Sequence, residues 1–475
     1  MPLKASLQWR QFLKTYQNMT VLILFLVITG YIFIAAESFT HINKAAVAVF
    51  AGVAAWLLYM LTGEGYVNAE HAEDFAFYQL SGGNSFNAFI AKNVFSKYIG
   101  DACEVILFLL ASIGIVEVLN GNGCFSFLGK IVHTRSSSKL MWFLALTSFL
   151  ISANVDNLST TVIMLVVMHK FVSGTKLRMI YGSAVVIASC CGGALTVIGD
   201  AGGLTLWTKG YITPSAYSLV MAAPTLLMLV TTTFMLSRLL PERLPARAFE
   251  CAIDNDSALS TWQRCVLVFV SIGGLWFIPT FHNITSLPPY VGALCVLSLL
   301  WVLNEIFNLR IMHSGKMVMR HSPVAMQYEN IQILLFYIGL TLMGGVCVET
   351  GIVETFTRWM CENIGNSYVL SAIGGVVSML LDNVAVVIAN TQMAASLENG
   401  PYVYESFACN GAYWPLLNYA CMAGSLLLSV GSLSGVMLMR MENVSFLWYL
   451  RRITPRVALG AAVGAVALIL ITELL

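Results

Sequence analysis

Residues 139–168 decide the fold, and they read KLMWFLALTSFLISANVDNLSTTVIMLVVM. Two apolar arms flank a polar centre that contains Asn154, Asp156 and Asn157. A helix needs about 20 residues to cross the hydrocarbon core of a bilayer, so this stretch is too short for two spans. A re-entrant hairpin fits, because each arm then crosses about half of the core. The polar tip stays within protein or a wet cavity, where irregular backbone is tolerated at depth.

The composition predicts that lipid surrounds this hairpin. Hydrophobic residues make up 58% of the 475 residues and charged residues 10%, and the mean hydropathy is +0.78. These values lie outside the range of soluble globular domains. Stretches near the spanning length occur at 20–36, 44–62, 101–119, 217–240, 264–281, 289–308, 330–350 and 453–475. We therefore expect a multi-pass protein of the cell inner membrane.

Two longer apolar stretches, 180–206 and 411–439, carry glycines and polar residues in their middle. Each predicts an interrupted helix. The stretch 367–396 repeats the hairpin pattern around Asp382 and Asn383. The sequence therefore contains two candidate hairpins and two candidate broken helices.

An internal repeat relates these elements. GIVEVL (114–119), VDN (155–157) and GGALTVIGDAGG (192–203) are followed in the same order by GVCVET (345–350), LDN (381–383) and GSLLLSVGSLSG (424–435). The paired aspartates Asp156 and Asp382 lie 226 positions apart, and the paired glycines Gly199 and Gly431 lie 232 apart.

The repeat predicts an all-α polytopic membrane protein of two inverted repeats, each with five spans, a re-entrant hairpin and one broken helix. The first repeat covers 1–240 (hairpin 139–168, broken helix 180–206), and the second covers 264–475 (hairpin 367–396, broken helix 411–439). An odd number of spans turns the second repeat upside down. The positive-inside rule then makes 241–263 a cytoplasmic linker.

Carboxyl groups within the membrane segments indicate the substrate. Ionisable groups at this depth are costly, so each is a functional hypothesis. Five stand out, with no Lys or Arg at comparable depth: Glu117, Asp156, Asp200, Glu349 and Asp382. A carboxylate without a cationic partner must be protonated or hold a cation, so the site is built for cations. Asp156 and Asp200 have a structural alternative as helix caps, and Glu117 and Glu349 have one at span ends near the interface.

Small hard cations prefer oxygen ligands. Broken helices free backbone carbonyls, and the first repeat adds side-chain oxygens from Asp156, Asn157, Ser159, Thr160 and Thr161. In the second repeat a less charged set comes from Asn383, Ser429, Ser432 and Ser434. Because a proton and Na+ exclude one another at a carboxylate, such a site predicts antiport.

The segments SANVDNLSTTVIM (152–164) and GGALTVIGDAGGLTLW (192–207) resemble the D-type Na+/H+ antiporters (NhaD) of the ion transporter superfamily. The likeness spans residues 100–440 and implies paired hairpins, unwound helices and a homodimer with elevator-like motion. By this resemblance Asp156, Asn157 and Asp200 hold Na+ or the proton, with Asn383 and Ser432 as partners. The sequence departs from the family pattern after Asp200, where Ala201, Gly202 and Gly203 replace Thr-rich residues.

Other functional classes remain as alternatives. An anion carrier of the same superfamily, such as a dicarboxylate symporter or arsenite efflux permease, should have Ser-Asn-Thr tips rather than acidic ones. A membrane enzyme would need a nucleophile or metal cluster, and no HExxH, GxSxG or clustered His motif occurs in the sequence. We therefore expect a transporter of Na+ or Li+ and H+, with no bound cofactor, no nucleic-acid partner and lipid as its surroundings.

Overall fold

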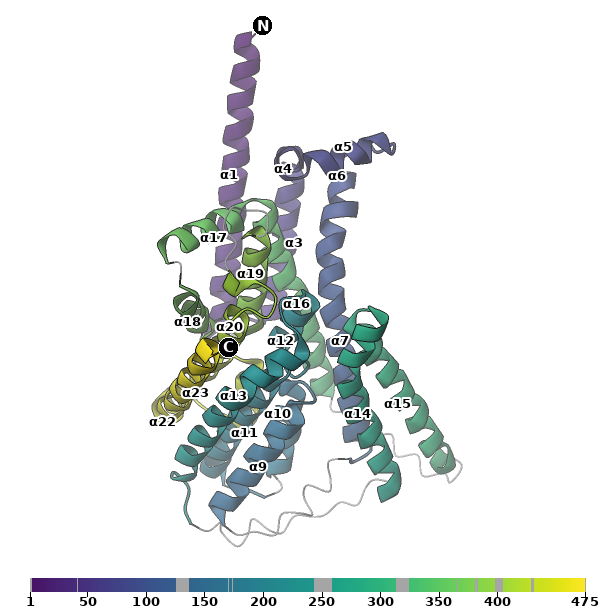
Figure 1. Ribbon diagram of the computed structural model, residues 1–475, viewed down its shortest axis with the longest axis vertical. Helices are drawn as coiled ribbons and strands as arrows, with labels where there is room; N and C mark the ends of the chain where they lie inside the picture. The colour runs from purple at the N-terminus through teal and green to yellow at the C-terminus, as the bar shows by residue number, and fades with distance from the viewer. Residues whose placement is uncertain are drawn as a thin grey trace. The chain divides into compact units, whose positions relative to one another are not determined.

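The computed structural model describes residues 2–40, 42–124, 136–169, 171–172, 174–242, 259–312, 324–364, 366–379, 381, 383–397, 405–428 and 431–474. In this part of the chain the structure consists of helices and the turns between them (Figure 1). The described residues form two compact units, and each unit takes segments from both halves of the sequence.

The first unit contains residues 1–103, 331–366 and 388–403, as far as they are described. Its elements are α1 (Pro2–Ala35), α2 (Glu37–Thr40), α3 (Lys44–Leu61), α4 (Gly63–Glu70), α5 (Ala72–Leu80), α6 (Phe86–Phe89), the π-helix η1 (Ile90–Phe95), the start of α7 (Ser96–Gly121), most of α16 (Val324–Glu349), α17 (Ile352–Asn363) and the end of α19 (Asn383–Leu397). Helices α1 and α3 pack against each other.

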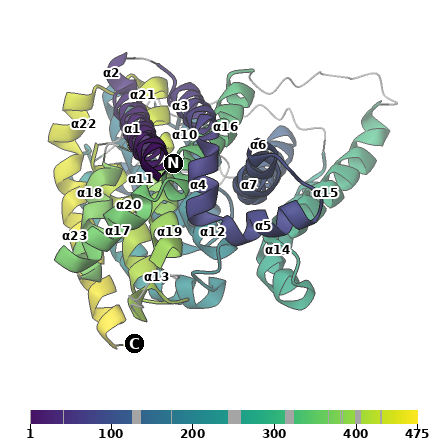
Figure 2. The same cartoon turned by 90° about the horizontal axis from the view of Figure 1, so that it is seen from above.

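The second unit contains the remaining described residues. Its helices are most of α7, α9 (Ser137–Ser152), α10 (Asn157–His169), α11 (Thr175–Leu195), α12 (Ala201–Thr208), α13 (Pro214–Ser237), α14 (Thr261–Thr285), α15 (Pro289–Met312), α18 (Ser367–Ser378), the start of α19, η3 (Glu405–Phe407), α20 (Tyr413–Leu428), α21 (Leu433–Glu442), α22 (Phe446–Arg452) and α23 (Thr454–Leu474). Both views show α18 beside α20 and α14 beside α15 (Figures 1 and 2).

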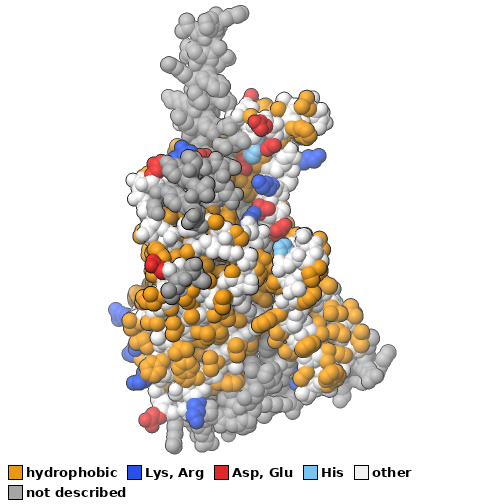
Figure 3. Space-filling model, viewed as in Figure 1, with side chains coloured by type: hydrophobic (Ala, Val, Ile, Leu, Met, Phe, Trp, Pro, Cys, Tyr) orange, Lys and Arg blue, Asp and Glu red, His pale blue; other side chains and the backbone are white. Residues whose placement is uncertain are grey.

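Nine helices among the described residues are long and apolar enough to cross a membrane. Many of their outward side chains are hydrophobic, and on the face shown in Figure 3 such side chains are spread widely over the described surface. Exposed apolar surface of this extent is expected where lipid is the solvent. The predicted all-α, multi-pass membrane protein is therefore confirmed.

Both predicted helix interruptions are present. Helix α11 ends at Leu195 and α12 begins at Ala201, while α20 ends at Leu428 and α21 begins at Leu433. Asp200 and Ser432 are the N-cap residues of α12 and α21, in an extended backbone conformation. Glycines and polar residues in the middle of each stretch explain these breaks, since glycine weakens a helix and capping residues begin a new one.

The stretch that decided the fold forms the pair α9 and α10, of 16 and 13 residues. Both are shorter than the approximately 20 residues that a spanning helix needs. In the second half α18 has 12 residues and α19 has 15. These lengths fit arms that cross part of the bilayer. The position of the two pairs in the membrane stays a prediction.

The same hydrogen bonds hold each short helix to its broken helix. Ser152 Oγ donates to the carbonyl of Ser189 at 2.6 Å, and Ser378 Oγ donates to the carbonyl of Cys421 at 2.8 Å. These residues are paired by the offsets of 226 and 232 that the sequence motifs show. The internal repeat therefore extends to tertiary contacts, while its inversion across the membrane stays a prediction.

Close helix contact recurs at the same two places. A Cβ at Gly192 would lie 2.2 Å from the carbonyl oxygen of Phe149, and a Cβ at Gly424 would lie 2.0 Å from that of Gly375. Only glycine permits this approach of α9 to α11 and of α18 to α20. The two packed pairs position the breaks, and hence Asp200 and Ser432.

Candidate cation-binding site

Asp200 lies at the break between α11 and α12 and is 4% exposed. Its Oδ2 accepts a hydrogen bond from the backbone N–H of Gly202 at 3.2 Å. This is the bond that an N-cap side chain makes to the otherwise unsatisfied donors of a helix start. The capping bond explains why an aspartate directly precedes α12. It does not by itself explain why the charge is buried.

Amide groups from two other helices meet the same carboxylate. Asn157, the first residue of α10, donates from Nδ2 to Asp200 Oδ1 at 3.0 Å. Asn383, the first residue of α19, donates from Nδ2 to Oδ1 at 3.1 Å and to Oδ2 at 3.3 Å. All three residues belong to the second unit. The structure therefore brings together Asn157, Asp200 and Asn383, which the sequence had placed in one site.

These amide donors are neutral, so they orient the carboxylate without cancelling its charge. A buried carboxylate of this kind is costly unless a proton or a cation neutralises it. The arrangement can therefore hold Na+ in one state and a proton in another.

Asp156 directly precedes α10, and its two oxygens differ. Oδ2 accepts from the backbone N–H of Ser159 at 2.8 Å, which caps the helix. Oδ1 is buried and has no hydrogen-bond partner within the described part of the chain. The capping alternative thus accounts for one oxygen, while the other is available to a ligand.

The two threonines predicted in the site also differ. Thr161 donates from Oγ1 to the carbonyl of Asn157 at 2.8 Å, so its hydroxyl is used within α10. Thr160 is fully buried, and its Oγ1 has no partner among the residues that the structure describes. Thr160 is therefore the one of the two whose oxygen is available.

Asn383, predicted to belong to a second oxygen set, donates its amide to Asp200. Ser432 Oγ accepts from the N–H of Gly435 at 3.0 Å and caps α21. Ser434 Oγ is buried without a partner within the described ranges. Asp382 and Ser429 lie outside the described residues. Ion binding by Ser432 stays a prediction.

Two polar residues of this region were missed by the sequence interpretation. Asn418 on α20 and Tyr217 on α13 are both buried, and Asn418 Nδ2 donates to the Tyr217 hydroxyl at 2.5 Å. The signal for Asn418 is a lone amide inside an apolar helix, YWPLLNYACMA (413–423), and an uncharged amide is a weaker sign of function than a carboxyl group at the same depth.

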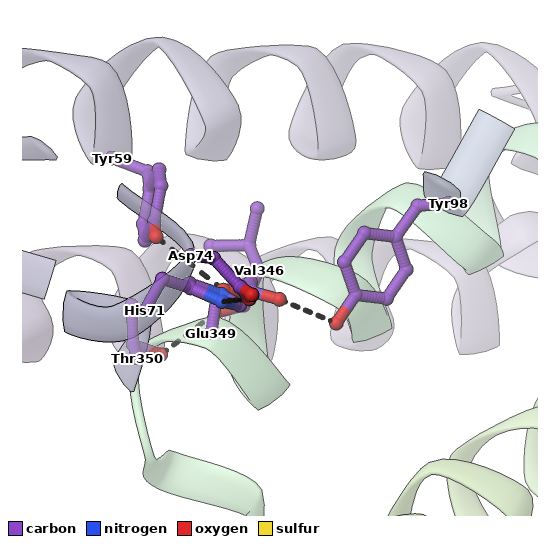
Figure 4. A network of polar contacts seen from close by, with 7 residues as sticks. All are labelled: Tyr59, His71, Asp74, Tyr98, Val346, Glu349 and Thr350. Carbon is purple, nitrogen blue, oxygen red and sulfur yellow. Dashed lines mark hydrogen bonds and ion pairs between the residues drawn. The ribbon is translucent and has the colours of Figure 1, made fainter. Parts of the chain in front are cut away.

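Glu349 lies in the first unit and ends α16. Its Oε1 accepts from the Tyr98 hydroxyl at 2.8 Å, and its Oε2 binds His71 Nε2 at 2.7 Å and the Tyr59 hydroxyl at 3.5 Å (Figure 4). Glu349 is 7% exposed. Protein groups therefore fix this side chain. Glu117, the other acid predicted near a span end, is half-buried on α7.

His71 lies between α4 and α5, outside the spanning helices. Its hydrogen bond to Glu349 raises the pKa of His71 above its ordinary value, and this effect outweighs burial, which acts to lower the pKa. Asp74, 3.7 Å from His71 Nδ1, adds to the rise. The network in Figure 4 is thus a partly buried ion pair when His71 is protonated.

Comparison with known proteins shows similarity to transporters. A family described as citrate transporter matches residues 23–408. The chain is 27% identical over 448 residues to sodium/proton antiporter 2 of Arabidopsis thaliana, covering 92% of this chain and 96% of that protein. It is 30% identical over 378 residues to sodium/proton antiporter 1 of the same plant, covering 79% of this chain and 63% of that protein. The Na(+)/H(+) antiporter NhaD of Vibrio parahaemolyticus is 25% identical to it over 403 residues, covering 78% of this chain and 91% of that protein.

Proposed function

The chain belongs to the citrate transporter family, and on that premise we propose that it exchanges Na+ or Li+ for H+ across a membrane, with Asp200 carrying the ion. The relatives named as sodium/proton antiporters support this choice of substrates within the family. The D-type antiporter resemblance seen in the sequence agrees with it.

One observation carries the proposal: a buried carboxylate receives neutral amides from two separate helix starts at a helix break. Such a group is stable at depth when it is protonated or when it holds a cation. Both states leave the site neutral. The elevator-like motion that the resemblance implies can therefore proceed with either ion bound, and it is disfavoured when the site is empty and charged.

Competition then gives antiport. A protonated Asp200 no longer attracts Na+, and bound Na+ keeps the proton away, so each return step carries the other ion. Na+ prefers oxygen ligands. The carboxylate supplies them, and a half-turn of the Asn157 amide would present its oxygen in place of its NH2 group. Backbone carbonyls freed at residues 196–199 lie in the same interruption.

An anion substrate is less compatible with this site, although the family description names citrate. Citrate and arsenite would have to approach a buried carboxylate of the same charge. The amide donors that could receive an anion, Asn157 and Asn383, are bonded to Asp200. The charge at Asp200 therefore favours a cation.

The test measures proton movement in everted membrane vesicles with a pH-sensitive dye after addition of NaCl, LiCl, KCl or sodium-free citrate. We expect dequenching with NaCl or LiCl that is lost in Asp200→Asn. As a matched control, Glu354→Gln removes an exposed carboxylate paired with Arg358 and should leave exchange unchanged. A response to citrate alone, or normal exchange by Asp200→Asn, would overturn the proposal.

We further propose a homodimer, on the basis of the resemblance to the D-type antiporters. Light scattering of the purified protein in detergent measures this state directly. A monomeric mass for the protein component would exclude the dimer while leaving the ion site unaffected.

A further inference from the structure

Asn418 is a buried amide that the mechanism above does not use. It lies on α20 and is 0% exposed. Its Nδ2 donates to the Tyr217 hydroxyl, and its Oδ1 has no hydrogen-bond partner among the residues described. Leaving a buried polar oxygen unpaired costs about 1–3 kcal/mol, so this oxygen calls for a physical explanation.

The hydrogen-bond network fixes which way the Asn418 amide points. The Tyr217 hydroxyl lies 3.0 Å from the carbonyl oxygen of Ala194, which can only accept, so the hydroxyl proton is donated there. The Tyr217 oxygen must then accept from Asn418, which requires the NH2 group on that side. Asn418 Oδ1 therefore points away from Tyr217.

Asn418 Oδ1 and Asp200 Oδ2 both lie next to Gly202. A Cβ at Gly202 would lie 2.7 Å from Asn418 Oδ1 and 2.8 Å from Asp200 Oδ2. Both atoms are acceptors, and the N–H of Gly202 is donated to Asp200 Oδ2. Two acceptor oxygens beside the same residue, one of them buried without a partner among the residues described, form a pair that a small cation can bridge.

We propose that Asn418 Oδ1 is a ligand of the transported Na+, opposite Asp200 Oδ2, and that Tyr217 is the positioning residue that holds this oxygen in place. This inference rests on the proposed function, and it names a ligand from α20 that joins the groups from α10, α12 and α19. The Na+ site then contains side chains from both predicted repeats.

The internal repeat explains why the ligand occurs once. The position 232 residues before Asn418 is Val186, a fully buried residue of α11. Asp200 likewise corresponds to Ser432, which lacks a charge. Asp200 thus comes from the first broken helix and Asn418 from the second, and neither has a matching ligand in the other repeat, so the two halves supply different groups to one Na+ site.

The test measures Na+ binding to the purified full-length protein in detergent, from the shift of its thermal midpoint with NaCl against choline chloride. Asn418→Ala should raise the apparent Kd for Na+ about tenfold, which corresponds to about 1.4 kcal/mol. Asn122→Ala is the matched control, because Asn122 is a buried amide that bonds Asn304 away from the site. An unchanged Kd in Asn418→Ala would overturn the proposal.

A second pair of variants keeps the proposal testable if Asn418→Ala does not fold. Tyr217→Phe removes the acceptor that orients Asn418, and Tyr449→Phe removes the equivalent hydroxyl, which donates to Leu426 at 3.0 Å. In exchange assays Tyr217→Phe should raise the KM for Na+ and keep the maximal rate, whereas Tyr449→Phe should keep both. Equal behaviour of the two variants would contradict the positioning role.

The outcomes separate this inference from the proposed function. If the wild-type protein exchanges Na+ for H+ and Asn418→Ala has a normal Kd, the function stands and the ligand assignment fails. If the wild-type protein neither binds nor exchanges Na+, both fail.

Discussion

At the scale of single residues, Asp200 combines two structural uses in one carboxylate. Oδ2 caps α12, and Oδ1 accepts the Asn157 and Asn383 amides. Each bond fixes the position of the carboxylate. These donors are neutral groups, and a buried carboxylate favours a proton or a transported cation beside it.

Gly202 offers a test of the two oxygens that lie next to it, Asn418 Oδ1 and Asp200 Oδ2. Gly202→Ala should weaken Na+ binding about tenfold or more, because the new methyl group would press on Asn418 Oδ1 and Asp200 Oδ2. Gly203→Ala is the control in the same helix turn, since its methyl group would meet Thr196 and Val197 at ordinary contact distances of 3.4 Å. The measurement is the Na+-dependent shift of thermal midpoint for both variants. Equal shifts would show that Na+ does not bind at the oxygens next to Gly202.

The sequence predicted part of this site and missed part of it. Asp200 and Asn157 stood out because a polar group in an apolar segment is costly, and Asn383 followed from the repeat. Asn418 satisfies the same rule, but its importance depends on a contact with Tyr217, 201 positions away. A contact across that separation has no local sequence signal, so the amide could not be distinguished from a structural residue.

At the scale of helices, buried ion pairs join elements that are distant in the chain. Glu442 ends α21 with its side chain fully buried, and it pairs with Arg178 at the start of α11 at 2.9 Å and with His169 at the end of α10. These contacts lie within the second unit. The pairs hold α10, α11 and α21 together close to their ends, so we expect the three helices to move as one body.

Removing this carboxylate should destabilise the protein. Glu442→Gln leaves Arg178 with a neutral partner in a partly buried position, at an expected cost of about 1–3 kcal/mol. Glu354→Gln breaks the exposed pair with Arg358 and should cost about 0.5 kcal/mol or less. Thermal denaturation of both variants in detergent gives the comparison. Equal losses would mean that burial does not strengthen the Glu442 pairs.

The Glu349 network makes the stability of the first unit depend on pH. Because the pKa of His71 is raised in the folded state, the protonated pair adds stability that is complete below the unfolded pKa of about 6.5. This stability is lost as pH rises through the raised pKa. His71→Gln should therefore lower the thermal midpoint more at pH 6 than at pH 9.

Glu349→Gln serves as the control for this pH dependence, because it removes the main cause of the raised pKa. In the Glu349→Gln protein, the lowering of the thermal midpoint by His71→Gln should no longer change with pH, apart from the smaller contribution of Asp74. If His71→Gln alone lowers the thermal midpoint by the same amount at every pH, the pair of His71 and Glu349 is not ionic.

Element boundaries followed from the sequence where local chemistry sets them. Asp200 and Ser432 are capping residues with glycines nearby, so the breaks of α11 and α20 could be predicted. The Glu349 network could not, since His71 and Glu349 are 278 positions apart. Glu349 had been interpreted from its place at a span end alone.

At the scale of the whole molecule, repeated contacts support two related halves. The Tyr217 hydroxyl donates to Ala194 and the Tyr449 hydroxyl to Leu426, both at 3.0 Å and both across the same sequence distance. Such pairing continues the offset of the sequence motifs. Motif order was enough to predict the repeat, because the repeat is encoded in local polar patterns, whereas the two tyrosine contacts required the structure.

Inversion of the halves predicts opposite labelling. In a cysteine-free background, Lys170→Cys should react with a membrane-impermeant thiol reagent from the cytoplasmic side and Glu398→Cys from outside. Both residues lie outside the described residues, directly after α10 and α19 in the sequence. Labelling of both from one side would exclude inverted repeats.

The most direct test of the central claim, that one carboxylate alternately holds H+ and Na+, is the initial rate of exchange in proteoliposomes against Na+ concentration at several pH values. Competition at Asp200 predicts that the apparent KM for Na+ rises as the pH falls, while the maximal rate stays constant. Asp200→Asn should show no exchange at any pH. A KM for Na+ that is independent of pH, with a maximal rate that changes instead, would contradict the claim.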